Sequence, residues 1–429
     1  MSYVVEKKKV FVSLMLCVFW IVGGFPFFCQ ELAFSLYEKI NPFLLLLADV
    51  VVIFLGIITL RKKNDIFIVV SFFTLAYIST CVLNGASVIQ FLNGIRHYIS
   101  FIFLVPIFRY CVDDIRTSSY YVDLIDRHLY AFLWLQLPCT IIQCVLYGAF
   151  DKVGGSLGWM YSGEISTLVY LISIYFMRKR WDINLGYIAN IRKNIELIVL
   201  LLPSFLNETK ISFIYFVLYF FFIMPLDRKL LIRVLVLAPC VAMIMPIMGS
   251  LYISLTGSSE NTLTASYMEE YLWGNADGQE FVELLLENGS EVIDEELNDF
   301  ARFAKFGALQ IIMEEQPQSY FWGFGVGQFK GGSLLDQTEL YKEYEWLFVG
   351  VRMTFYQVLM ELGILGLVWF VGVWVVLFKE GNNTRSLPMT IYLVILWVII
   401  GVYNAAFCNL AFSVVFMYIL YRRKLDIIK

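Results

Sequence analysis

The residues of this chain that could do chemistry are a few basic side chains close to long apolar segments. Four of them matter most: Arg96, Lys210, Arg302 and Arg352. An arginine donates paired hydrogen bonds from a planar fork, which suits a diphosphate, and a lysine supplies a compact point charge. Three of the four stand at the ends of apolar segments, where helices can bring them together. They predict a cationic site for an anionic ligand.

Other reactive groups are scarce. The chain has two histidines, His97 and His128, and eight cysteines without a CxxC spacing, so no metal site and no Ser-His-Asp arrangement is indicated. The glycines at 323–327 do not follow the GxGxxG spacing and no GK[ST] comes after them, which excludes nucleotide binding. Glu361 lies inside an apolar segment, where an acid could act as a base or pair with an arginine. No cofactor is predicted.

The elements that must position these residues are transmembrane helices. Hydrophobic residues make up 59% of the 429 residues and charged residues only 16%, and the mean hydropathy is +0.72. Apolar runs long enough to cross a hydrocarbon layer of about 30 Å recur, and they are apolar on every face, unlike the strands of an outer-membrane barrel. The first run lacks a small-residue cleavage site, which favours a retained span over a signal peptide. The prediction is an all-α integral membrane protein.

Twelve spans are predicted, and the distribution of charge orients them. With the N-terminus in the cytoplasm, 23 of the 32 basic residues fall on the inner side and 9 on the outer side. The positive-inside rule therefore predicts that both termini are cytoplasmic. The predicted spans are residues 10–29, 42–60, 66–83, 98–107, 128–147, 165–177, 197–206, 211–225, 234–252, 353–378, 388–403 and 407–420.

One long hydrophilic loop, residues 253–352, separates nine spans within residues 1–252 from three within residues 353–429. The loop holds 18 of the 36 acidic residues and only five basic ones, and is predicted to be an extracytoplasmic domain. Apolar residues recur every three or four positions across 280–315, which predicts amphipathic helices over the membrane core. A tight turn is predicted at 323–327. The aromatic residues of the loop could stack on sugars, but anchoring at the membrane interface is the favoured interpretation.

Lys210 is predicted to lie below the outer membrane surface. It belongs to a hairpin between two short spans, residues 197–206 and 211–225, and neither is long enough to cross the hydrocarbon layer easily. A basic residue at that depth costs about 2.5–3.5 kcal/mol and normally faces a polar cavity or a partner. Neutralisation by Glu208 is a purely structural alternative. Arg96 and Arg352 could likewise extend to the lipid headgroups.

The end of the loop resembles a known family. The segment FWGFGVGQF at 321–329, then Arg352, then MELGILGLVWF at 360–370 are similar to the carboxy-terminal signature of the bacterial O-antigen polymerase and ligase superfamily. Ten residues separate Arg352 from Gly363, a pattern associated with the polymerases, whereas the lipopolysaccharide ligases carry histidine at the first position. The segment ETKIS around Lys210 resembles the outer hairpin where family members carry SR or SK. Arg302 lies roughly where many members have an arginine.

The resemblance implies a GT-C-like polymerase/ligase architecture of about twelve transmembrane helices in the bacterial cytoplasmic (inner) membrane. It implies a glycosyltransferase without metal or other cofactor that makes O-antigen or capsular polysaccharide. Undecaprenyl-diphosphate-linked oligosaccharide would be both donor and acceptor, at a site open to the periplasm or exterior. The lipid bilayer and a chain-length regulator protein are the other partners, and nucleic acid is not one.

The resemblance also assigns roles to single residues. Arg352 and Lys210 would bind the diphosphate, with Arg96 and Arg302 supporting them. Arg352, Lys210 and Glu361 would be catalytic, because a diphosphate is already a good leaving group and mainly needs preorganised positive charge. Two candidates remain for the base that accepts the hydroxyl proton.

These candidate bases are Glu361 and His97. Two other functions remain open as well. A ligase would transfer the glycan to lipid A core, and a flippase would move lipid-linked oligosaccharide across the membrane. A flippase usually has short loops and two repeated halves, which this sequence does not show.

Overall fold

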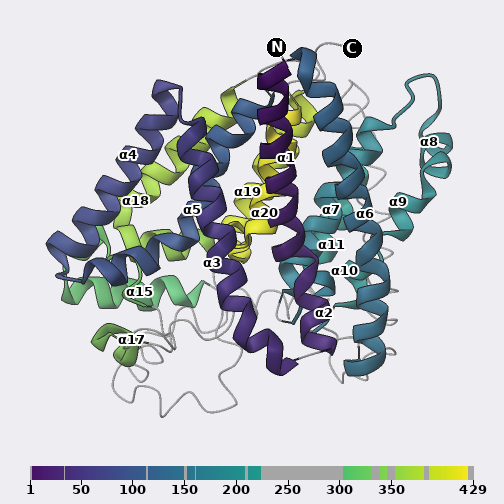
Figure 1. Ribbon diagram of the computed structural model, residues 1–429. Helices are drawn as coiled ribbons and strands as arrows, with labels where there is room; N and C mark the ends of the chain where they lie inside the picture. Colours follow the sequence, from purple (N-terminus) through teal and green to yellow (C-terminus); the bar gives the residue numbers. More distant parts are fainter. Residues whose placement is uncertain are drawn as a thin grey trace.

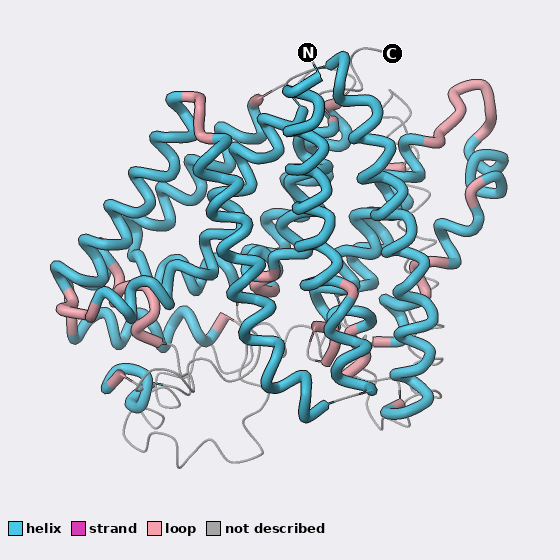
Figure 2. The backbone as a smooth tube through the Cα atoms, in the orientation of Figure 1, coloured by secondary structure: helices cyan, strands magenta, loops and turns pink. Residues whose placement is uncertain are grey.

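The computed structural model describes residues 2–32, 34–112, 115–148, 152–159, 161–207, 211–223, 303–329, 338–344, 353–380 and 386–423. Within these ranges every regular element is a helix, as Figure 2 shows. The prediction of an all-α protein is confirmed for this part of the chain.

The first half of the chain forms long helices that run back and forth beside one another (Figure 1). Helix α5 is central, packing against α3 on one side and against α20 on the other. The elements in order are α1 (Ser2–Gly23), α2 (Phe25–Leu32), α3 (Phe34–Thr59), α4 (Lys63–Tyr77), the π-helix η1 (Ile78–Leu83), α5 (Val88–Val112), α6 (Ile115–Tyr147) and the short 3-10 helix η2 (Gly155–Leu157).

The second half mixes long and short helices. Helix α18 is long, whereas α8 to α10 are short and follow one another along the chain, with α9 and α10 packed against α7. The elements are α7 (Ser162–Lys179), α8 (Tyr187–Lys193), α9 (Ile195–Val199), α10 (Pro203–Leu206), α11 (Ile211–Phe222), α15 (Ala304–Glu315), α16 (Gln318–Trp322), α17 (Glu339–Tyr344), α18 (Thr354–Lys379), α19 (Leu387–Tyr403), the 3-10 helix η6 (Ala406–Cys408) and α20 (Leu410–Arg422).

The length and the apolar composition of the helices indicate a membrane protein. Six described segments are long and apolar enough to cross a bilayer: Lys8–Glu31, Ile40–Thr59, Lys63–Leu83, Val88–Cys111, Tyr120–Tyr147 and Thr354–Lys379. The outer helices expose large apolar side chains, with Phe43 at 73% and Phe67 at 70% exposure. Water would penalise such surfaces, whereas lipid tails would not, so these faces of α3 and α4 suit a hydrocarbon environment.

One predicted span has a wrong start. The predicted span 98–107 is part of a helix that begins ten residues earlier, at Val88. The polar segment NGIRHY lowers the hydropathy there, but Arg96 forms an ion pair with Asp49 of α3 and so is accommodated inside the helix. The predicted span 197–206 is divided between α9 and α10. The predicted span 234–252 lies outside the described residues.

The start of α1 and the end of α20 lie at the same end of the bundle, at the top of Figure 1. This termini end carries Lys8, Arg109, Arg178 and Arg422 on different helices. The opposite end, called the loop end below, carries α15 and α17, and the turn between α19 and α20 points toward it from inside the bundle (Figure 1). The two ends differ in how their polar groups are satisfied.

Candidate functional site

The glycine-rich turn at 323–327 is a tight turn, as its sequence predicts. Gly323, Gly325 and Gly327 have φ values of +70°, +92° and +83°, a backbone conformation that favours glycine. Each also lies against other backbone. A Cβ atom on Gly323 would stand 2.4 Å from the carbonyl carbon of Glu361, and one on Gly325 would stand 2.8 Å from Cα of Thr80. Glycine is therefore required here for both conformation and space.

The turn fills a break in helix α18. Gly363 has φ 65° and ψ −164°, so the helix is interrupted one turn after Met360. The backbone amide of Phe324 donates to the carbonyl of Met360 at 2.9 Å, and that of Gly325 donates to the carbonyl of Glu361 at 2.9 Å. The turn thus satisfies the carbonyl groups that the break leaves without helical partners.

The π-helix η1 holds the other side of the turn. The Ser79 hydroxyl donates to the carbonyl of Trp322 at 2.5 Å, and the amide of Val326 donates to the Thr80 hydroxyl at 2.8 Å. Because the amides of Phe324, Gly325 and Val326 all donate to protein acceptors, these groups are not available to cradle a phosphate. The turn is a structural clamp between η1 and α18.

Glu361 lies directly beside this clamp and is 2% exposed. The Tyr98 hydroxyl donates to its Oε2 atom at 2.5 Å, and the Gln357 amide lies 3.5 Å from its Oε1 atom. The thiol of Cys408 donates to Oε1 of the Gln357 side chain at 3.5 Å. A buried polar chain therefore connects α5, α18 and η6 next to the break in α18.

Arg96 points to another side of α5. Its Nε atom lies 2.8 Å from Oδ2 of Asp49 on α3, and its side chain is about one-third exposed. Two positions along a helix correspond to a rotation of about 200°, so Arg96 and Tyr98 face different neighbours. His97 lies between Arg96 and Tyr98 in the sequence and is half-buried. Around the helix it points about 100° away from each of them. The structure therefore separates Arg96 from the polar chain around Glu361.

Lys210, Arg302 and Arg352 lie outside the described residues, but the chain on either side of Lys210 is described. Asn207 is fully buried, and its amide donates to the carbonyl of Ser162 at 2.8 Å and to the hydroxyl of Ser166 at 2.7 Å. Ile211 is only 4% exposed. The segment that leads to Lys210 is therefore attached to the first turns of α7.

The segment that follows Arg352 is attached close to the same place. The amide and the hydroxyl of Thr354 both donate to the carbonyl of Asn404 at 3.0 Å. A Cβ atom on Gly163, in the first turn of α7, would lie 3.5 Å from Nδ2 of Asn404. The flanks of Lys210 and Arg352 thus meet at the start of α7, although about 140 residues separate them in sequence.

Two buried polar atoms of the loop end have no hydrogen-bond partner among the described residues, and one of them, Nδ2 of Asn404, lies at this meeting point. The other is the hydroxyl oxygen of Tyr356, whose ring packs against Phe306 of α15, and each residue is 3% exposed. A buried polar group without a partner costs about 1–3 kcal/mol. Such groups are found at functional sites, where a ligand completes their hydrogen bonds.

Three further polar residues of the loop end were not singled out by the sequence. Glu164 lies in the first turn of α7, just before the predicted span 165–177, and burial raises the pKa of its carboxyl to about 7. Lys305 is 2% exposed in α15, on the side that also carries the buried residues Ala308 and Leu309. Tyr356 is the third. Their only sequence signal was a polar residue near the end of an apolar run.

The part of the loop that is described packs as a small separate core over α18. Of the helices predicted across 280–315, the described part contains α15, with Leu309 and Ile312 buried while Gln310 and Glu314 are exposed. Residues 253–302, which include most of the predicted amphipathic segment, lie outside the described residues.

Among the described residues, no group of three or more His, Cys, Asp or Glu side chains could hold a metal ion. No protein-family model matches the sequence, and no curated protein matches it either. The residues themselves and their arrangement at the loop end are therefore the basis for a function.

Proposed function

We propose that this chain polymerises undecaprenyl-diphosphate-linked oligosaccharide repeat units at the outer face of the bacterial cytoplasmic membrane. In this proposal the chain has twelve spans and a GT-C-like architecture, both termini are cytoplasmic, and the loop 253–352 is outside. The loop end of the bundle then faces the periplasm or exterior, and the termini end with its many basic residues faces the cytoplasm, as the positive-inside rule requires.

The observation that carries the proposal is the meeting of the two flanking segments at the start of α7. Asn207, three residues before Lys210, and Thr354, two residues after Arg352, are both held at this place. Two cations with fixed flanks near buried, unsatisfied polar groups suit a diphosphate partly shielded from water. In such a site each interaction with a developing negative charge is stronger than it would be in bulk solvent.

The reaction would be a glycosyl transfer between two lipid-linked chains. A hydroxyl oxygen of the incoming repeat unit attacks the anomeric carbon of the growing chain and forms the new glycosidic bond. The bond from that carbon to the diphosphate oxygen breaks, and undecaprenyl diphosphate leaves with the electron pair. Lys210 and Arg352 stabilise the charge that develops on the diphosphate. The hydroxyl proton passes to a base of the protein.

Glu164 is the carboxylate best placed to be that base. It belongs to the same helix turn that anchors Asn207 and lies against Asn404. Glu361 lies seven residues after Thr354, about 10 Å deeper along α18, and already accepts a hydrogen bond from Tyr98. His97 neighbours Tyr98 at this same depth in α5. We therefore assign the proton transfer to Glu164 and a positioning role to Glu361.

Replacement of the two cations tests the proposal. In a strain that depends on this chain for its surface polysaccharide, Arg352→Ala and Lys210→Ala should each leave single repeat units in place of long chains. Loss of one preorganised charge in such a site costs about 10²- to 10³-fold in rate. Lys342→Ala is a matched control, because Lys342 is an exposed lysine in α17 of the same loop. Normal chain-length ladders from both cation variants, with the proteins present in the membrane, contradict the assignment.

The pH dependence of polymerisation tests the base. A general base must be deprotonated, so the rate should fall as the pH drops below about 7, the pKa of the Glu164 carboxyl. Glu164→Gln should lower the rate strongly and remove this acidic limb, whereas Glu361→Gln and His97→Gln should keep it. If the rate of Glu164→Gln still falls below about pH 7 as in the wild type, the general base is another group.

A further inference from the structure

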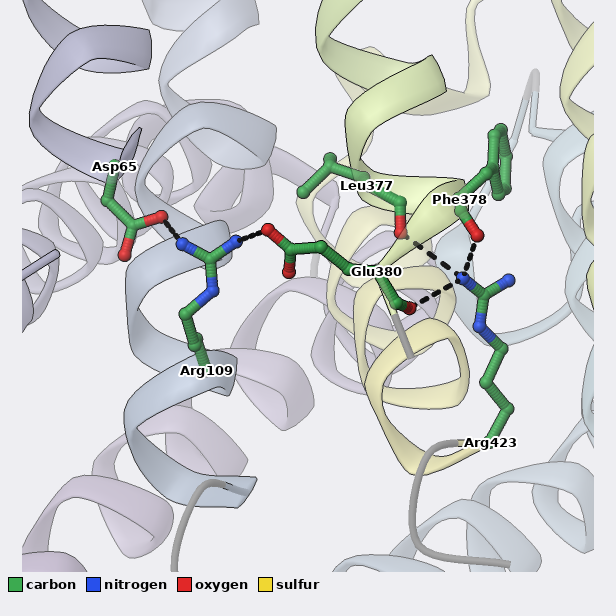
Figure 3. Close-up of polar contacts among 6 residues, drawn as sticks. All are labelled: Asp65, Arg109, Leu377, Phe378, Glu380 and Arg423. Atoms are coloured by element: carbon green, nitrogen blue, oxygen red, sulfur yellow. Dashed lines mark hydrogen bonds and ion pairs between the residues drawn. The ribbon is translucent and has the colours of Figure 1, made fainter. Parts of the chain in front are cut away.

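Two basic side chains of the termini end, Arg109 and Arg423, are fixed inside the bundle (Figure 3). Arg109 lies between the carboxylates of Asp65 and Glu380, and Arg423 donates to backbone carbonyls at the end of α18. The segment that follows α7 at this end is arranged differently. It is a hairpin, residues 181–194, which contains α8 and stands at the edge of the bundle (Figure 1).

One buried side chain, Asn190, holds the hairpin in shape. Its Oδ1 atom accepts from the backbone amide of Asp182 at 2.9 Å. Its Nδ2 atom donates to the carbonyls of Asp182 at 2.9 Å and Leu185 at 3.1 Å. The Asp182 carboxylate also accepts from the amide of Asn184 at 3.0 Å. Hydrogen bonds therefore fix the turn of the hairpin, and its exposed apolar side chains are not part of that packing.

The hairpin presents large apolar side chains to its surroundings. Ile183 is 93% exposed and Ile188 is 74% exposed, and Leu185 is exposed as well. Water penalises such apolar surface, whereas lipid tails do not. Neighbouring exposed apolar groups of this kind mark a surface that contacts another molecule or a membrane.

The chain that follows the hairpin favours lipid as the occupant of this surface. Ile195 and Val199 of α9 and Leu202 before α10 are between 42% and 52% exposed. The other sides of α9 and α10 pack against α7, with Leu197 and Leu200 fully buried. The exposed sides suit hydrocarbon, as those of α3 and α4 do. This lipid-facing surface begins at Ile195, directly after the hairpin.

The aromatic and basic residues of the hairpin suit the headgroup layer. The rings of Trp181 and Tyr187 pack 5.8 Å apart, and these two residue types are enriched at membrane–water interfaces. Arg192 is exposed and lies four positions after Ile188, on the same face of α8. A long basic side chain in this position can place its stem along the apolar groups and its charge among the phosphates.

The charge of the segment favours an anionic membrane surface. Residues 178–196 contain five basic and two acidic side chains. The two acids, Asp182 and Glu196, lie 3.5 Å from Lys193 and 2.6 Å from Arg180, respectively. The hairpin and its ends therefore carry a net positive charge, which attracts anionic lipid headgroups.

We propose that the hairpin 181–194 is an interfacial anchor that binds anionic lipid at the termini end. Ile183, Leu185 and Ile188 lie among the upper parts of the acyl chains, and Arg192 and Lys193 contact lipid phosphates. Amphipathic segments with apolar and basic side chains lie in the plane of the interface in this way. The anchor is independent of the proposed glycosyl transfer, which takes place at the opposite end of the bundle.

Photo-crosslinking of the full-length protein tests the anchor. The protein is placed in nanodiscs of phosphatidylcholine and phosphatidylglycerol with p-benzoylphenylalanine at the position of Ile183, and lipid adducts are measured after illumination. Phe67, which is 70% exposed on α4, is the lipid-facing control position. Glu339 in α17, with a side chain 91% exposed, is the polar control position. Lipid adducts as frequent at Ile183 as at Phe67 support the anchor.

Two results overturn it. One is a yield of lipid adducts at Ile183 no higher than at Glu339, which would leave the hairpin in water. The other is a crosslink to a second copy of the chain in place of lipid, which would make the surface a contact between copies. Should the variant at Ile183 not fold, the same comparison is made at Ile188, the other highly exposed isoleucine of the hairpin.

Removal of a charge tests the preference for anionic lipid. Arg192→Gln should lower the ratio of phosphatidylglycerol to phosphatidylcholine adducts at Ile183 about fivefold, the contribution of one basic residue near an anionic surface. Lys342→Gln is the matched control, because it removes an exposed charge from α17 at the loop end and should leave the ratio unchanged. An equal ratio in Arg192→Gln and the protein without this substitution contradicts the contact with lipid phosphates.

Discussion

The termini end and the loop end of the bundle treat their polar groups differently. At the termini end, Arg109 is held between Asp65 and Glu380, and both Arg109 and Asp65 are almost fully buried. At the loop end, Asn404 and Tyr356 bury polar atoms that no described residue satisfies, and Arg423 buries such an atom, its Nε, at the termini end. Neutralised charge holds helices together, whereas an unsatisfied group is useful only when a ligand completes it. The ion pairs of Arg109 therefore support stability, and in the proposed function substrate completes the hydrogen bonds of Asn404.

The largest effect is expected from breaking the buried ion pairs of the termini end. Arg109→Ala leaves Asp65 buried without its main partner and should lower the free energy of unfolding by about 3–5 kcal/mol. Thermal unfolding of the purified protein measures this change. Arg180→Ala removes an ion pair whose side chains are about one-third exposed and should cost about 1 kcal/mol or less. Equal losses of unfolding free energy from the two substitutions would contradict the stabilising role of the buried ion pairs.

A smaller effect is expected at the clamp that positions the loop end. Gly325→Ala forces a side chain into φ +92° with its Cβ 2.8 Å from Cα of Thr80, and should cost about 1–3 kcal/mol. Polymer length should fall with it, because the clamp holds Glu361 and the start of α18. Gly372→Ala is the control, since a Cβ there meets nothing within 4 Å and alanine favours the helix by up to about 1 kcal/mol. Thermal unfolding and polymer ladders are recorded for both variants.

The smallest effect on stability is expected from removing the buried hydroxyl of Tyr356. Tyr356→Phe removes a buried hydroxyl that has no partner among the described residues, so the free energy of unfolding should stay the same or rise slightly. Under the proposed function polymerisation should nevertheless decline, because substrate would complete the hydrogen bonds of this hydroxyl. Loss of stability without loss of activity would show that Tyr356 belongs to the packing of the loop end and not to its chemistry.

The sequence predicted the elements better than their long-range contacts. Runs of apolar residues located α1, α3, α4 and α18 closely, because the thickness of a bilayer sets the length of a span. The start of α5 was missed by ten residues, since the residue that accommodates Arg96 inside the helix lies 47 positions away, at Asp49. An average of hydropathy over neighbouring residues cannot detect a partner so far away in the sequence.

The same limit applies to the candidate site. The glycine spacing predicted a tight turn, but not that the turn fills the break at Gly363 and is held by η1. The position of Glu361 in an apolar run marked it as unusual, whereas its donor Tyr98 comes from another helix. Glu164 and Asn404 carry no motif at all. Their interest arises only because the flanks of two distant cations are held beside them.

The most direct test of the proposed polymerase activity is elongation of the glycan by the purified protein in detergent. Wild-type protein is mixed with undecaprenyl-diphosphate-linked repeat units, and the glycans are separated by length. The account predicts chains of two or more repeats, with one undecaprenyl diphosphate released for each new linkage, and no chains with Arg352→Ala. Repeat units that stay single with wild-type protein in detergent, yet cross the bilayer of sealed vesicles containing it, would contradict the account and indicate a flippase.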